Sequence, residues 1–98
     1  MENKLEIINN NQQMQFEYRE GDEIALLEYR FLENNVAMMH TLVPESMKGK
    51  GVASALAEYA FEYAKHENKK VIVYCPFVAV YLKRHPELNE QLNKTHQL

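Results

Sequence analysis

The sequence predicts an α+β fold with one mixed β-sheet, in the element order β-β-β-β-α-β-α. Apolar and polar residues alternate over residues 14–32, which indicates half-buried antiparallel strands. An apolar stripe with helical spacing over residues 51–68 indicates an amphipathic helix. A β-branched run at residues 71–75 follows, so the antiparallel meander should end in a strand–helix–strand crossover, which is expected to be right-handed. The stripe consists of Val52, Ala55, Leu56, Tyr59, Ala60 and Tyr63.

The N-terminal third is predicted to form three strands joined by tight turns. Residues 5–8 (LEII) are a short apolar run that ends at an asparagine-rich turn. Residues 14–19 form the second strand, and a glycine turn at residues 20–22 leads into a return strand over residues 23–32. The second strand should place Met14, Phe16 and Tyr18 on the core face and Gln15, Glu17 and Arg19 in solvent; the return strand should bury Ala25, Leu27, Tyr29 and Phe31.

The remaining elements are a fourth strand and a second helix. Residues 36–43 (VAMMHTLV) are apolar almost throughout, which is typical of a strand covered on both faces. Pro76 suits the first position of a helix, which should run to Arg84 and stop before the following His-Pro pair. We expect one domain over residues 1–98, with a polar, frayed tail from about Asn89.

Composition excludes several classes of function. The net charge of −3 disfavours nucleic acid and anionic membranes as partners, and no apolar run is long enough to span a bilayer. A single cysteine excludes an intrachain disulfide, so we expect a cytoplasmic protein. The His, Cys, Asp and Glu residues lack metal-ligand spacing, so no metal is expected.

The stretch MKGKGVASAL, residues 47–56, is the strongest local signal of function. Gly49 and Gly51 are two of only three glycines, and they precede a predicted helix. Unpaired N–H groups at a helix start, with the lysines at 48 and 50, favour a phosphate or pyrophosphate site. Neither the P-loop pattern nor the dinucleotide fingerprint matches. The alternative is a tight turn with solubilising lysines.

Residues 48–53, KGKGVA, resemble the Q/R-x-x-G-x-G/A signature of the GNAT acetyltransferase superfamily. LEYRF, HTLVPESMKGKG and CPFVAVYLKRHPEL are similar to its minimal, single-domain (YjdJ-type) branch, over about residues 5 to 88. The chain departs from the signature in opening with Lys48 instead of Gln or Arg. It also lacks the parts that build much of the acceptor pocket in larger members, which leaves the acceptor open.

The resemblance implies acetyl-CoA as the acetyl donor, with loop amides holding its pyrophosphate. Two cations near the end of the second helix could meet the 3′-phosphate of coenzyme A, or could simply be favourable charges at a helix C-terminus. The expected binding residues are Val43, Lys48, Gly49, Lys50, Gly51, Val52, Ala53, Ser54, Lys83 and Arg84.

Three residues are candidates for catalysis. The resemblance implies that Cys75 accepts acetyl or takes part in catalysis, and a helix N-terminus there would stabilise its thiolate; the alternative is a buried filler. His40, expected on the face of Val36 and Met38, is a candidate base or partner of Cys75, or a core histidine. The resemblance implies that Tyr81 protonates the departing coenzyme A thiolate; otherwise it is a core aromatic.

The sequence therefore predicts an acetyl-CoA-dependent N-acetyltransferase with an unidentified amine acceptor. Transfer would be direct or would pass through an acetyl thioester on Cys75. The first alternative is a non-catalytic module that binds coenzyme A or acyl-CoA. The second is a small protein-interaction domain.

Overall fold

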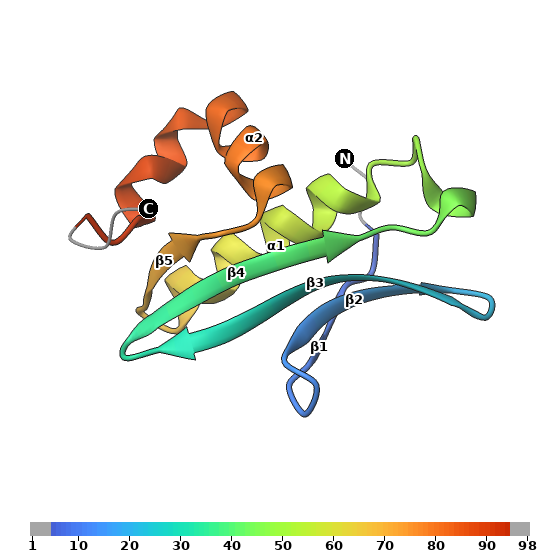
Figure 1. Ribbon diagram of the computed structural model, residues 1–98, viewed down its shortest axis with the longest axis horizontal. Coiled ribbons are helices and arrows are strands. Elements are labelled where there is room, and N and C mark those ends of the chain that lie inside the picture. Colours follow the sequence, from blue (N-terminus) through green and yellow to red (C-terminus); the bar gives the residue numbers. More distant parts are fainter. Residues whose placement is uncertain (1–4, 95–98) are drawn as a thin grey trace.

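The computed structural model describes residues 5–94 and contains a five-stranded sheet in the order β1-β2-β3-β4-β5 (Figure 1). The pairs β1–β2, β2–β3 and β3–β4 are antiparallel, and β5 pairs in parallel with β4. The predicted α+β class and element order are confirmed. The elements are β1 (Ile8–Asn10), β2 (Gln15–Glu20), β3 (Glu23–Leu32), β4 (Asn35–Leu42), α1 (Val52–His66), β5 (Lys70–Val73) and α2 (Pro76–Arg84), with 3₁₀ turns at Glu45–Met47 and Pro86–Gln91.

The core lies between one face of the sheet and α1. Phe16 of β2 stacks on Tyr29 of β3 and touches Tyr59 and Tyr63 of α1, so these rings join the sheet to the helix. Burying each large apolar side chain contributes about 1.5–3 kcal/mol. Helix α1 is buried over a wider arc than its predicted stripe, because α2 packs on its second side through Phe61.

The two ends of the described chain differ from the prediction. The first strand begins at Ile8, not at residue 5, and includes two asparagines that the sequence assigned to a turn. They suit a strand because Asn9 Oδ1 accepts a hydrogen bond from the Tyr29 hydroxyl at 2.7 Å. The prediction of a frayed tail from Asn89 is wrong as far as Asn93, because Leu92 bridges to Val71 and the Asn93 N–H donates to the Val71 carbonyl at 2.9 Å.

A β-bulge in β4 changes which side chains face the core. His40 pairs with Glu28, but Met38 pairs with the next residue, Tyr29, so Met39 is the extra residue. Thr41 therefore shares the core face with Met38, and His40 turns to the opposite face. The prediction of a strand covered on both faces holds for the first half of β4 only.

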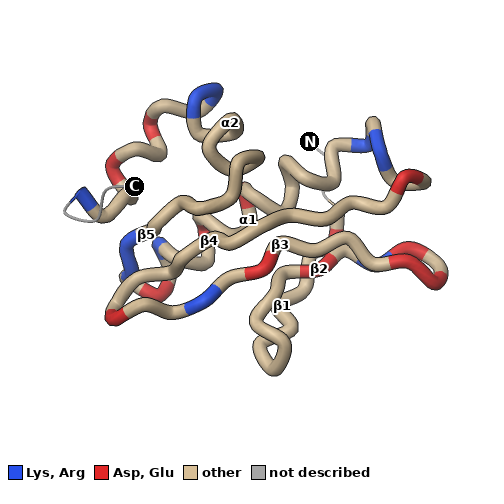
Figure 2. The backbone as a smooth tube through the Cα atoms, in the orientation of Figure 1, with Lys and Arg blue, Asp and Glu red and all other residues tan. Residues whose placement is uncertain are grey.

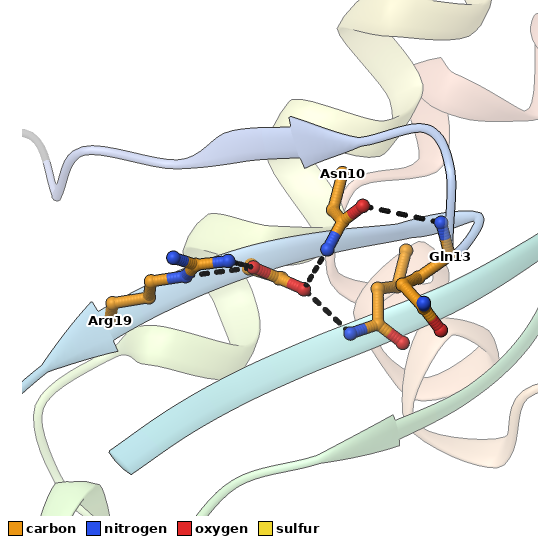
Figure 3. A network of polar contacts seen from close by, with 5 residues as sticks. Asn10, Gln13 and Arg19 are labelled. Carbon is orange, nitrogen blue, oxygen red and sulfur yellow. Dashed lines mark hydrogen bonds and ion pairs between the residues drawn. The ribbon is translucent and has the colours of Figure 1, made fainter. Parts of the chain in front are cut away.

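Glu17 was predicted to face solvent, but it is only 1% exposed. Its carboxylate accepts hydrogen bonds from Asn10 at 2.8 Å, Gln15 at 2.6 Å and Arg19 at 2.7 and 2.9 Å (Figure 3). Burial alone would raise the pKa of Glu17, but these hydrogen bonds and the Arg19 charge bring the pKa below its ordinary value. The expected solvent face of β2 thus carries a buried ionised group.

Candidate functional site

The loop between β4 and α1 has a backbone that requires glycine. Gly49 has φ +83° and Gly51 has φ +78°, both in the left-handed region that other residues adopt at a cost. A Cβ at either position would meet no atom within 4 Å, so the surrounding space is open. The glycines therefore allow the left-handed backbone that turns the chain from β4 into α1. They also leave the start of α1 accessible.

The N-terminus of α1 offers uncompensated backbone donors. Gly51 is the N-cap, no side chain caps the helix, and the first turn carries no acidic residue. The Ala55 N–H is bonded to the Gly51 carbonyl, but the N–H groups before it have no acceptor within the helix. These donors and the helix dipole favour an anion.

A cavity of about 330 Å³ opens at this helix start. It collects all the predicted loop residues except Lys50, and also three residues that the sequence did not single out. Those three are Thr41, Met47 and Phe77. Its full lining is Thr41, Val43, Met47, Lys48, Gly49, Gly51, Val52, Ala53, Ser54 and Phe77.

The two loop lysines have different environments. Lys48 lines the cavity and makes no ion pair with any residue in the range 5–94. Lys50 instead directs its Nζ to Glu20 Oε1 at 3.1 Å, at the end of β2. Ser46 in the same loop also donates to Glu23, so the β2–β3 hairpin is tied to the loop twice.

Cys75 lies at the N-cap of α2 and is 2% exposed. Its Sγ is 3.3 Å from Thr41 Oγ1, and its backbone N–H donates to the Met38 carbonyl at 3.0 Å. Thr41 also lines the cavity, so the thiol sits behind the cavity wall. Within the described part of the chain, the side-chain contact of this thiol is a hydroxyl and not a base.

The predicted partnership of His40 with Cys75 is wrong. The bulge at Met39 places Thr41 beside the thiol and His40 on the other face of the sheet, 52% exposed. There its Nδ1 is 3.5 Å from Glu28 Oε1. His40 is therefore a member of a surface pair and not a core residue.

Tyr81 lies in a groove between α1 and α2 and does not line the loop cavity. Its ring stacks on His85 at 4.1 Å and faces Phe61 of α1. Burial raises the pKa of Tyr81, and the charges of Glu58, Glu62 and Glu87 raise it further. Its neutral form is thus favoured.

Lys83 and Arg84 are exposed in the last turn of α2. They line neither the loop cavity nor the groove, and the blue segment of α2 in Figure 2 marks them at the C-terminal end of the helix. Their position suits the other predicted role, as cations at a helix C-terminus.

Phe77 is one of the three cavity residues that the sequence did not single out, and its position could have been inferred from the local sequence. It is the second residue of a helix that begins with proline directly after a buried strand. The start of that helix returns to the β4–β5 junction, where the Tyr74 and Cys75 N–H groups share the Met38 carbonyl. Thr41 had no such signal, because only the bulge turns it to the cavity.

The fold and this loop define a class of protein. A mixed sheet whose fourth strand passes through a left-handed glycine loop into a helix, and returns as a parallel fifth strand, is the architecture of the acetyltransferases that the sequence resembles. The sequence model of the GCN5-related N-acetyl-transferase family matches residues 15–92. The chain belongs to this family.

Several known proteins are similar to the chain. Protein NATD1 of Xenopus tropicalis is 32% identical over 63 residues, which is 63% of this chain and 58% of that protein. Human NATD1 is 30% identical over 63% of this chain and 56% of its own length. Mouse NATD1 is 27% identical over 84% of this chain and 77% of its own length. The chain thus spans less than two thirds of the length of the frog and human relatives.

A solved structure extends the likeness to the fold. The solution structure of a GCN5-like protein from Staphylococcus aureus superposes with a TM-score of 0.71 at 26% identity. The match covers 92% of this chain and 89% of that chain. The fold is therefore shared over nearly the whole length of both proteins.

Residues 5–94 contain neither a candidate metal-binding group nor a helix that could span a membrane. Within that range, His, Cys, Asp and Glu form no group of three that could hold a metal ion. The helices of the same range are too short or too polar to cross a membrane.

Proposed function

We propose that the protein is an acetyl-CoA-dependent N-acetyltransferase whose loop cavity holds the pyrophosphate of the donor. One observation carries the proposal: two left-handed glycines present the uncapped, acid-free start of α1 to a cavity at the end of β4. The N–H groups of the first turn would bind phosphate oxygens, and Lys48 would add a full charge. Val43, Met47 and Phe77 add apolar side chains to the lining of the same cavity.

The environment of Cys75 favours direct attack by an amine over a thioester route. A thioester on Cys75 needs the thiol deprotonated and open to the donor. The thiol is 2% exposed and contacts Thr41, and His40 lies on the other face of the sheet. In direct transfer the amine nitrogen attacks the thioester carbonyl, the C–S bond breaks, and the coenzyme A thiolate leaves and takes up a proton.

A second candidate function is a binding module for coenzyme A or acyl-CoA. The lining of the cavity favours it, because the lining residues include neither a carboxylate nor a histidine that could take the proton of an attacking amine. Turnover distinguishes the two functions. A protein that binds acetyl-CoA but acetylates no amine in a broad screen is the module.

Calorimetric titration with acetyl-CoA tests the loop assignment. Gly51→Val should weaken binding at least tenfold, because the side chain would narrow the approach to the α1 donors and strain the left-handed backbone. Gly21→Val is the matched control, since Gly21 also has a left-handed φ of +61° but lies in the β2–β3 turn. Equal affinity in folded Gly51→Val and wild-type protein would refute the assignment.

A further inference from the structure

The tip of the β2–β3 hairpin contacts the loop between β4 and α1, residues 43–51, which we call the donor loop. The β3–β4 ladder ends at Leu42, so the first part of β3 and the end of β2 extend past β4 (Figure 1). There, Glu20 accepts hydrogen bonds from Lys50 Nζ at 3.1 and 3.4 Å. Glu23, which pairs with Glu20 across the turn, accepts one from Ser46 Oγ. The hairpin tip is therefore joined to the donor loop at two points.

The second half of the donor loop has little support from packing. Met47 and Val52 are buried, at 1% and 2% exposure, and anchor the chain on either side of residues 48–51, which are exposed. A Cβ on either loop glycine would meet no atom within 4 Å, so no neighbour restrains the glycines on that side. Glycine adopts left-handed and right-handed backbone about equally well, so this stretch loses much conformational entropy when it takes one shape. The contact of Lys50 thus falls where packing restrains the loop least.

The side chain of Lys50 is directed away from the cavity that would hold the donor. Residues 48, 49 and 51 line this cavity, but Lys50 does not, and its ammonium group lies on the Glu20 carboxylate instead. With Asp22, the hairpin tip carries three carboxylates (red in Figure 2) beside the start of α1. Their charge alone would weaken the binding of an anion there. A contribution to the shape of the loop would act in the opposite direction.

We propose that the β2–β3 hairpin holds the donor loop in its binding shape, with Glu20 and Glu23 as positioning residues that act through Lys50 and Ser46. The inference deepens the proposed function and rests on it for the identity of the ligand, whereas the order of the free loop does not depend on it. A loop that is already ordered loses less conformational entropy when it binds phosphate. Exposed ion pairs are weak, so the effect on affinity is a few-fold.

Backbone ¹⁵N relaxation of the full chain without ligand tests the tether. In Glu20→Gln, the order parameters of the amides of residues 49–51 should fall from about 0.85, typical of rigid backbone, toward about 0.6. Glu23→Ala should lower them as well. Glu20→Lys and Lys50→Glu should each loosen the loop, but the two together restore the ion pair with reversed polarity and should restore the order parameters. Asp22→Asn is the matched control, because Asp22 lies in the same turn and forms no ion pair with residues 5–94.

Calorimetric titration of the same variants with acetyl-CoA tests the positioning role. Glu20→Gln should weaken binding about threefold, although it removes a negative charge beside the proposed anion site. Charge repulsion alone predicts the opposite sign, that is, tighter binding. Asp22→Asn should bind as well as wild type or slightly more tightly. The double variant Glu20→Lys, Lys50→Glu should bind within about twofold of wild type, whereas Lys50→Glu alone should bind more weakly.

The outcomes separate this proposal from the proposed function. Unchanged order parameters in Glu20→Gln, or a charge exchange that does not restore them, overturn the tether whatever happens with acetyl-CoA. A looser loop with unchanged or tighter acetyl-CoA binding overturns the positioning role. Wild-type protein that does not bind acetyl-CoA, while its loop responds to the variants as expected, refutes the acetyltransferase and supports the tether.

Discussion

Glu17 lies on the face of the sheet opposite to α1, since its neighbour Phe16 packs on the helix. An ionised carboxylate at 1% exposure is stable only because four hydrogen bonds surround it. The donors come from β2 itself and from Asn10 of β1. The group therefore also holds the short β1 strand in the sheet.

We expect Glu17→Gln to lower the free energy of unfolding by about 1–3 kcal/mol at pH 7, because it removes the charge that pairs with Arg19 and replaces one of the two acceptor oxygens by an NH2 donor. The folded pKa lies below the ordinary value of 4.5, so this stability is present above that pH and is lost as pH falls through the folded pKa. The difference between variant and wild type should thus shrink below about pH 4, as measured by urea unfolding. An unchanged difference at acid pH would contradict the assignment; Glu33→Gln is the exposed control.

The loop lysines should differ in their effect on donor binding. Lys48 lines the cavity and has no ion-pair partner among residues 5–94, whereas Lys50 is already partly neutralised by Glu20. Lys48→Ala should therefore weaken acetyl-CoA binding by about fivefold and reduce its salt dependence, and Lys50→Ala should do so less. Titrations at two ionic strengths measure both quantities, with Lys69→Ala, at the other end of α1, as the control. Identical salt dependence in all four proteins would show that the lysines only solubilise.

At the scale of elements, the start of each helix meets the end of a neighbouring strand at the site. Helix α1 begins at Gly51 after β4, and α2 begins at Pro76 after β5. Because β4 and β5 are parallel, both helix starts lie at the same edge of the sheet. The cavity forms there, between the α1 start and Phe77.

The thiol at the α2 start provides a direct test of the reaction route. Cys75→Ala should bind acetyl-CoA within about twofold of wild type and lose only about 1 kcal/mol of stability, because it removes one buried sulfur. Wild-type protein incubated with acetyl-CoA should gain no acetyl mass on Cys75. An acetyl adduct that hydroxylamine removes, and that is absent from Cys75→Ala, would establish the thioester route instead.

At the scale of the whole molecule, residues 86–93 close the open side of β5. Leu92 bridges to Val71, and Lys70 Nζ donates to the Glu90 carbonyl at 3.0 Å. The Asn93 side chain also donates to Asn35 Oδ1 at 2.7 Å. This segment protects a sheet edge and carries Glu87 and Gln91 to the groove.

Leu92→Ala should lower the free energy of unfolding by about 1–2 kcal/mol, since its half-buried side chain packs against the core. Leu42→Ala is the matched control, because Leu42 is 57% exposed and the same change should cost under about 0.5 kcal/mol. Urea unfolding measures both. Equal losses would mean that the final segment contributes no more than a surface residue.

The amino-acid sequence alone determined the element order, the glycine loop and both helices, because these have local signatures. Alternation marked β2 and β3, the spaced apolar residues marked α1, and Pro76 marked the start of α2. Glycines between a strand and a helix likewise indicated a tight turn there, and the structure gives Gly49 and Gly51 a left-handed backbone. Each signal depends on neighbours within a few positions.

The tertiary structure decided which side chains meet. A single extra residue at Met39 exchanged the faces of His40 and Thr41, and a bulge has no period in sequence that could reveal it. Lys50 pairs with Glu20, 30 positions away, and Leu92 bridges to Val71 of β5, 21 positions earlier. Such contacts depend on how distant segments pack, so only the folded chain determines them.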